Sequence, residues 1–104
     1  MFIMHDRLGL HEKLCEILGS RNVYFQPPSS VLMRYPAIVY ERDNIHNRHA
    51  DDSIYAQSLK YSLTVIDYDP DSKIVEKVAK LPKCSFSRHF TSDNLNHDVF
   101  TIFY

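Results

Sequence analysis

The middle of the chain contains the sequence feature that most constrains its fold, a stretch of strict alternation. From Leu59 to Val65, apolar and polar residues alternate without a break. A period of two predicts a β-strand with one buried face and one face in solvent, as in an antiparallel sheet. Such a strand needs other elements to cover its apolar face, so the rest of the chain has to supply that cover.

Two segments have the apolar spacing and the end signals of helices. Apolar side chains recur on one helical face over residues 5–18, and Gly19 follows where a left-handed residue usually ends a helix. A second helix is expected to start with Asp69 as its N-cap and Pro70 in its first turn. Pro82 is expected to end it, because proline lacks the backbone donor and clashes with the preceding turn.

Three further stretches are rich in apolar and aromatic residues and are bounded by turn formers. This pattern predicts strands over residues 35–41, 84–90 and 98–104. The turn-rich segment 91–96 joins the last two, and residues 23–25 are a candidate for a short extended piece. The expected order is α-β-β-α-β-β, an α+β fold with two helices packed on one face of a four-stranded, mostly antiparallel sheet. A chain of 104 residues suits a single domain, 1–104.

The segment 42–53 is dense in charge and has no apolar period, so we expect a long loop there. Loops of this length inside a compact domain are uncommon and are usually functional or disordered. Its charged and imidazole side chains are therefore candidate interface residues: Arg42, His46, Arg48, His49, Asp51 and Asp52.

The overall charge and the N-terminal residues exclude several classes of partner. Twelve basic and thirteen acidic residues give a net charge of −1, whereas nucleic-acid binders usually have a basic excess. We therefore expect no sequence-specific nucleic-acid partner. The N-terminus has neither the apolar region of a signal peptide nor the roughly 20 apolar residues of a membrane span. We expect a protein made in the cytoplasm, with no membrane partner.

No ordered catalytic set is present, and we expect neither enzymatic activity nor a cofactor. The sequence has no Gly-rich phosphate loop, nucleophile elbow or paired-acid motif. One remote alternative is a metal-dependent enzyme, since His46, His49, Asp51 and Asp52 are ligand types for a metal ion. Their spacing is weak support because nothing in an irregular segment fixes ligand geometry, so we favour an interface loop.

The last predicted strand is apolar on both faces, which indicates that both faces are covered. Val99 and Phe103 lie on one face, and the other carries the candidate interface residues Phe100, Ile102 and Tyr104. If the two helices cover one face, a second subunit is expected to cover the other, and tyrosine is favoured at such interfaces. The alternative is that the chain itself folds over this face.

Several stretches of the sequence resemble small phage and prophage proteins encoded among head and tail morphogenesis genes. The resemblance covers most of the chain, and its parts are specific as a set: Leu10–Gly19, Val23–Pro28, Tyr35–Glu41, Val65–Ser72 and Phe90–Phe100. The group is similar to the tail terminator, or tail-to-head joining, proteins of long-tailed phages.

This resemblance implies a non-enzymatic virion protein of the tail or neck. It implies an α+β subunit that forms a ring, usually a hexamer, capping the tail tube and facing the head-tail connector protein, with the 42–53 loop at the ring opening. The implied partners are copies of the chain itself, the tail tube protein and the connector. A head-completion, connector or minor capsid protein of the neck remains an alternative, as does a regulatory binder of a host factor.

Overall fold

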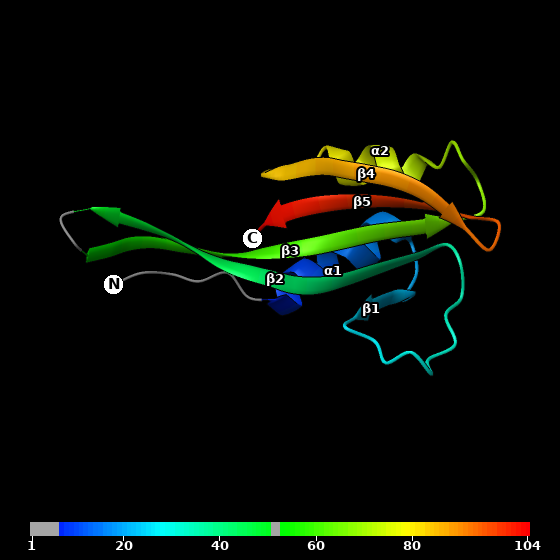
Figure 1. Cartoon of the computed structure of the whole chain (residues 1–104), viewed down its shortest axis with the longest axis horizontal. Coiled ribbons are helices and arrows are strands. Elements are labelled where there is room, and N and C mark those ends of the chain that lie inside the picture. Colours follow the sequence, from blue (N-terminus) through cyan, green and yellow to red (C-terminus); the bar gives the residue numbers. More distant parts are fainter. Residues whose placement is uncertain (1–6, 51–52) are drawn as a thin grey trace.

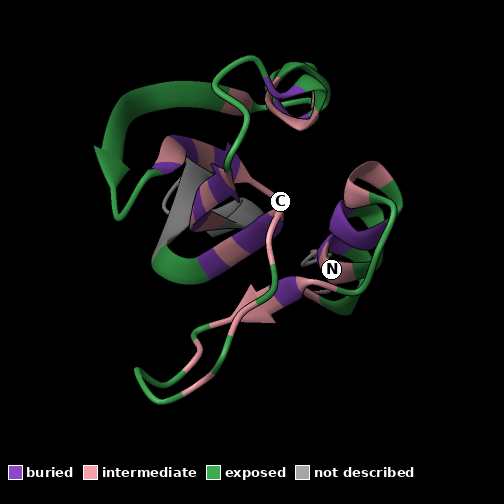
Figure 2. Ribbon diagram, turned by 90° about the vertical axis from the view of Figure 1, so that its right-hand side faces the viewer, coloured by how far each residue is buried: buried purple, intermediate pink, exposed green. Residues whose placement is uncertain are grey.

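A computed structural model describes residues 7–50 and 53–104, and describes side chains outside residues 44–59. The described residues form two helices and five strands. In chain order these are α1 (Arg7–Leu18), β1 (Val23–Phe25), β2 (Ala37–Ala50), β3 (Ser53–Asp67), α2 (Lys73–Ala79), β4 (Cys84–Ser92) and β5 (Leu95–Phe103). Both helices lie on one face of the sheet, so the predicted α+β class is confirmed (Figures 1 and 2).

The sheet has five strands in the order β1-β2-β3-β5-β4, where four were predicted. The additional strand is β1, which pairs in parallel with β2, whereas all other neighbours are antiparallel. Backbone bonds from Ile38 N to Asn22 O (3.0 Å) and from Gln26 N to Tyr40 O (2.9 Å) continue this pairing at both ends of β1. A strand of only three residues is stabilised mainly by pairing with its neighbour, so its own sequence predicts it only weakly.

The segment predicted as a long loop over residues 42–53 is a hairpin in the structure. β2 continues to Ala50, β3 begins at Ser53, and these two residues are paired. The prediction was wrong because a period of two is visible only where one face of a strand is buried. Backbone pairing between two strands creates a ribbon without needing that period.

The second helix begins later than predicted. Its N-cap is Ser72, whose hydroxyl accepts a bond from Ile74 N at 3.3 Å, and the helix starts at Lys73. Asp69 instead accepts a bond from Asp71 N (2.9 Å), and Asp67 accepts one from Asp69 N (3.1 Å). Aspartate side chains often shape turns in this way, and two successive turns occupy the segment assigned to the first helical turn.

The first helix ends as predicted. Gly19 has φ +79°, and its N–H donates to Cys15 O at 2.8 Å, which closes the last turn in the left-handed conformation that glycine favours. α1 packs Leu10 and Leu14 into the core, next to Val78 from α2. The helices thereby cover the face of the sheet that carries Tyr40, Tyr61, Leu63, Val65, Phe100 and Ile102.

Two of the candidate interface residues on β5 therefore belong to the core. Phe100 is 1% exposed and Ile102 is 2% exposed, because the register places them opposite Leu63 and Tyr61 on the helix-covered face. The prediction that they lie on an open face was wrong. The opposite face includes Val99, which the single chain already buries. With both faces of a strand apolar, the sequence alone did not indicate which face the helices take.

Candidate interaction surfaces

The most prominent surface feature is the far end of the β2–β3 hairpin. β5 pairs with β3 only from Lys60 to Asp67, and β1 pairs with β2 only from Ile38 to Tyr40. Beyond these points the described parts of β2 and β3 pair only with each other, and the ribbon projects past the rest of the sheet (Figure 1). The molecule measures 50 Å along this direction and 24 and 23 Å across it.

Four of the nine sequence-predicted interface residues lie on β2, three of them in this ribbon. Arg42 is exposed on β2 opposite Tyr61, and positions 46, 48 and 49 pair with positions 58, 56 and 54 of β3. Asp51 and Asp52 lie outside the described residues. The structure thus places Arg42, His46, Arg48 and His49 on one strand, β2, whereas Phe100 and Ile102 lie on β5 and Tyr104 follows it.

The metal alternative gains no support from the described residues. No group of three or more histidine, cysteine, aspartate or glutamate side chains lies together among them. The side chains at positions 46, 49, 51 and 52 lie outside those that the structure describes, so the metal alternative stays a hypothesis.

The edge strand β4 is the second exposed feature. It lies at one end of the sheet order, pairs with β5, and is exposed at every residue except Cys84 (Figure 2). Phe86 (57% exposed) makes an edge contact with Phe100, with ring centroids 5.5 Å apart. Phe90 stacks on His97 at 4.6 Å. Edge strands offer unpaired backbone groups to other chains, although the bulge between Phe86 and Arg88 disfavours regular pairing here.

A partly buried polar cluster joins α1 to β2. Tyr40 is fully buried, and its hydroxyl accepts a bond from Arg7 Nη1 at 3.1 Å. His11 Nδ1 lies 2.8 Å from the same oxygen, so the hydroxyl hydrogen is placed to donate to it. The Arg7 guanidinium also lies 4.2 Å from the centre of the Phe25 ring. Burial raises the pKa of the Tyr40 hydroxyl, while Arg7 acts in the opposite direction.

This burial predicts that the fold weakens at alkaline pH. Burial raises the pKa of both the Tyr40 hydroxyl and the Cys84 thiol above their ordinary values of 10.0 and 9.0. In the unfolded chain both groups ionise at those ordinary values, whereas the folded protein keeps them neutral to higher pH. These two groups should therefore add no pH dependence below about pH 8, and the free energy of unfolding should fall progressively above about pH 9.

Urea denaturation at a series of pH values tests this prediction, with the Tyr40→Phe and Cys84→Ser variants as matched controls. Each variant should lose the part of the alkaline decline that its own group contributes. A double variant with the same alkaline slope as the wild-type chain would show that other groups cause the decline.

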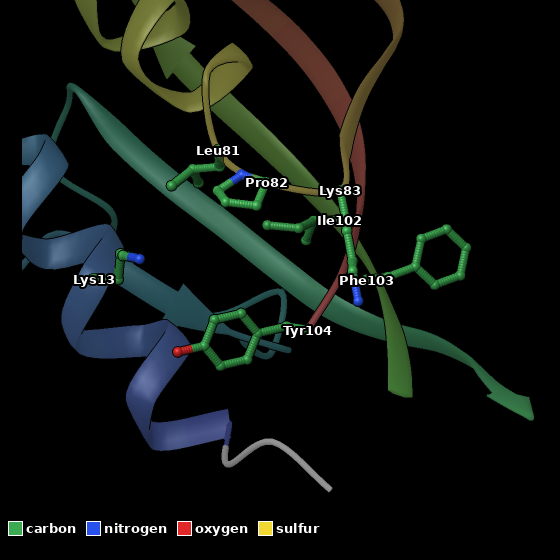
Figure 3. Close-up of a pocket in the computed structure, with 7 residues that line it drawn as sticks. All are labelled: Lys13, Leu81, Pro82, Lys83, Ile102, Phe103 and Tyr104. Atoms are coloured by element: carbon green, nitrogen blue, oxygen red, sulfur yellow. The ribbon is translucent and has the colours of Figure 1, made fainter. Parts of the chain in front are cut away.

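A pocket of about 280 Å³ opens between α1, the α2–β4 connection and the end of β5 (Figure 3). Its apolar residues include Leu81, Pro82 and Ile102, and two lysines line it. The Tyr104 ring lies against α1, where a Cβ atom on Gly9 would be 3.1 Å from the phenol oxygen, so a larger residue there would require the ring to shift by a few tenths of an ångström. The full lining of the pocket consists of Lys13, Leu81, Pro82, Lys83, Ile102, Phe103 and Tyr104.

Sequence reasoning identified Ile102 and Tyr104 as candidates but missed the pocket. The lining comes from three segments far apart in the chain, and no local pattern connects Lys13 with Lys83. Ile102 and Tyr104 line the pocket rather than an open sheet face.

Comparison with known proteins gave no match, either to the family models or to the curated proteins that were searched. Neither described helix has the length and apolar character that crossing a membrane requires.

Proposed function

We propose that this chain is a non-enzymatic structural subunit of a tailed phage or prophage, which assembles into a ring at the end of the tail tube. In this role it terminates tail assembly and joins the tail to the head, with the tail tube protein and the head-tail connector as partners. The sequence stretches that resemble tail terminators support the phage assignment, and the surface geometry supports assembly.

The projecting β2–β3 ribbon is the observation that carries the proposal. Two-stranded hairpins are only marginally stable in water when nothing else packs on them. Among the described residues, no third strand pairs with the ribbon between Asn44 and Ala50 or between Ser53 and Leu59. A neighbouring subunit would supply the missing support, and copies arranged head to tail close into a ring when the rotation allows it.

Removing the ribbon should therefore abolish assembly and leave the body folded. In the variant, residues 45–59 are replaced by Asn-Gly, a favoured two-residue turn, between the paired residues Asn44 and Lys60. We expect the wild-type chain to form rings in electron micrographs, with a hexamer mass by light scattering. The truncated chain should be a monomer with an unchanged circular dichroism spectrum per residue of the body.

A surface change far from the ribbon, Leu32→Ser, is the control and should leave the rings intact, because Leu32 lies in the β1–β2 connection and is exposed. A wild-type chain that stays monomeric at high concentration and does not bind tail tubes contradicts the proposal. Copurification with portal rings rather than tail tubes would favour the head-completion or connector alternative.

A further inference from the structure

The pocket beside Tyr104 combines an apolar interior with two positive charges. Ile102 and Leu81 supply apolar surface, and Lys13 and Lys83 are also part of the lining (Figure 3). Among the described side chains, the ion pairs are Arg21–Glu12, Lys60–Asp43 and His89–Asp98, so neither pocket lysine has a carboxylate partner there. Such a pocket suits an apolar or aromatic group that has negatively charged groups next to it.

The pocket is large enough for one large side chain of a protein partner. Its volume of about 280 Å³ lies at the lower end of the range of ligand sites, roughly 300–1,000 Å³. An aromatic residue next to carboxylates has the required chemistry.

The same chain presents such a residue on the β3–α2 connection. Tyr68 is 64% exposed, and Asp67, Asp69 and Asp71 surround it in the sequence. None of these three carboxylates is in an ion pair among the described side chains. The turns formed by Asp67 and Asp69, together with an edge contact to Tyr35 at 5.9 Å, hold this segment in a defined shape.

The pocket and the Tyr68 segment cannot meet within one copy. Asp67 pairs with Asn96 at the start of β5, whereas the pocket includes Phe103, which pairs with Lys60. These two pairs are seven residues apart along β3, a separation of roughly 23 Å at the usual rise of a strand. The two features lie at opposite ends of the sheet (Figure 1). A contact between them joins two copies head to tail.

We propose that Tyr68 of one copy inserts into this pocket of the next copy, with the carboxylates of Asp67, Asp69 and Asp71 facing Lys13 and Lys83. The inference rests on the proposed self-assembly and specifies one of its contacts. Burial of an aromatic ring and pairing of opposite charges both favour the contact, and tyrosine is often a dominant residue in interfaces. Because the two surfaces differ, the contact is heterologous and repeats around a ring.

The test uses two full-length variants that each remove one side of the contact. Tyr68→Ser removes the inserted ring, and Lys13→Glu with Lys83→Glu reverses the charge of the pocket. Each variant should need a protein concentration at least about tenfold higher to assemble, as measured by sedimentation velocity. Mixing the two variants should give a one-to-one dimer and no ring, because only one intact contact can then form.

Charge reversal on both sides provides a second readout. Adding Asp71→Lys to the pocket double variant should restore part of the assembly, since opposite charges then face each other again. Asp71 is chosen because the side chains of Asp67 and Asp69 form the two turns. Leu32→Ser, a change of an exposed apolar residue in the β1–β2 connection, is again the control and should assemble as the wild-type chain does. Unchanged circular dichroism spectra confirm that each variant is folded.

Rings that persist in both variants at wild-type concentrations would overturn this contact and leave the proposed function standing. A wild-type chain that never assembles would overturn both. A mixture of the two variants that remains monomeric would also count against the contact.

Discussion

Replacing Phe100 with alanine is expected to lower the free energy of unfolding by about 3–5 kcal/mol, the usual cost of removing a large buried aromatic side chain. Phe100 lies at 1% exposure in the core between the sheet and the helices. The register holds it opposite Leu63 on one side and Phe86 on the other. The substitution leaves a cavity that these neighbours fill only in part.

Phe86→Ala is the matched control, because Phe86 and Phe100 form the same aromatic contact but differ in burial. Phe86 is 57% exposed, so its loss should cost only about 1 kcal/mol, the order of an aromatic pair contact. Urea denaturation followed by circular dichroism measures both values. A Phe100→Ala chain that keeps its stability and loses only assembly would place Phe100 at an interface, as the sequence alone suggested.

Local signals explain which parts of the fold could be predicted from the sequence. The end of α1 follows from Gly19, whose positive φ any helix-ending glycine can adopt. The β4–β5 turn follows from Asp93 and Asn94, which both have positive φ, as a two-residue hairpin turn of type I′ requires. These residues determine their own backbone conformation, so neighbouring sequence was sufficient.

The features that could not be predicted depend on contacts between distant segments. β1 is a strand because β2 lies beside it, and residues 42–50 are strand because residues 53–61 pair with them. Likewise, the burial of Phe100 depends on which face of the sheet the helices cover. Neither pairing nor the choice of face leaves a periodic pattern in a polar or uniformly apolar stretch.

The candidate interaction surfaces were predicted only in part, for the same reason. Charge density pointed to the segment that projects from the body, but predicted a loop where the structure has a ribbon, and the interface role stays a prediction. The pocket needed α1, the α2–β4 connection and β5 to come together, and no motif in any one of them indicates the other two. The sequence around Tyr68 indicates that this residue is exposed, because aspartates flank it and aspartate is mostly found at protein surfaces.

Tyr40→Ala is the second large effect that we expect, a loss of about 3–5 kcal/mol in the free energy of unfolding, the range for large buried aromatic residues. Tyr40 is fully buried, and its ring lies 4.9 Å from Phe25 and 5.9 Å from Tyr61 between centroids. Its loss would also leave Arg7 and His11 without their shared hydroxyl partner.

Tyr40→Phe separates the stability contributed by packing of the ring from that contributed by the hydrogen bonds of the hydroxyl. The phenylalanine ring keeps the contacts with Phe25 and Tyr61, so only the bonds to Arg7 and His11 are lost, at a cost of about 1–2 kcal/mol. Because both partners lie on α1, amide hydrogen exchange should speed up most in that helix and little in β4. If the phenylalanine variant lost as much stability as the alanine variant, the hydroxyl rather than the ring would be the main attachment of α1 to the sheet.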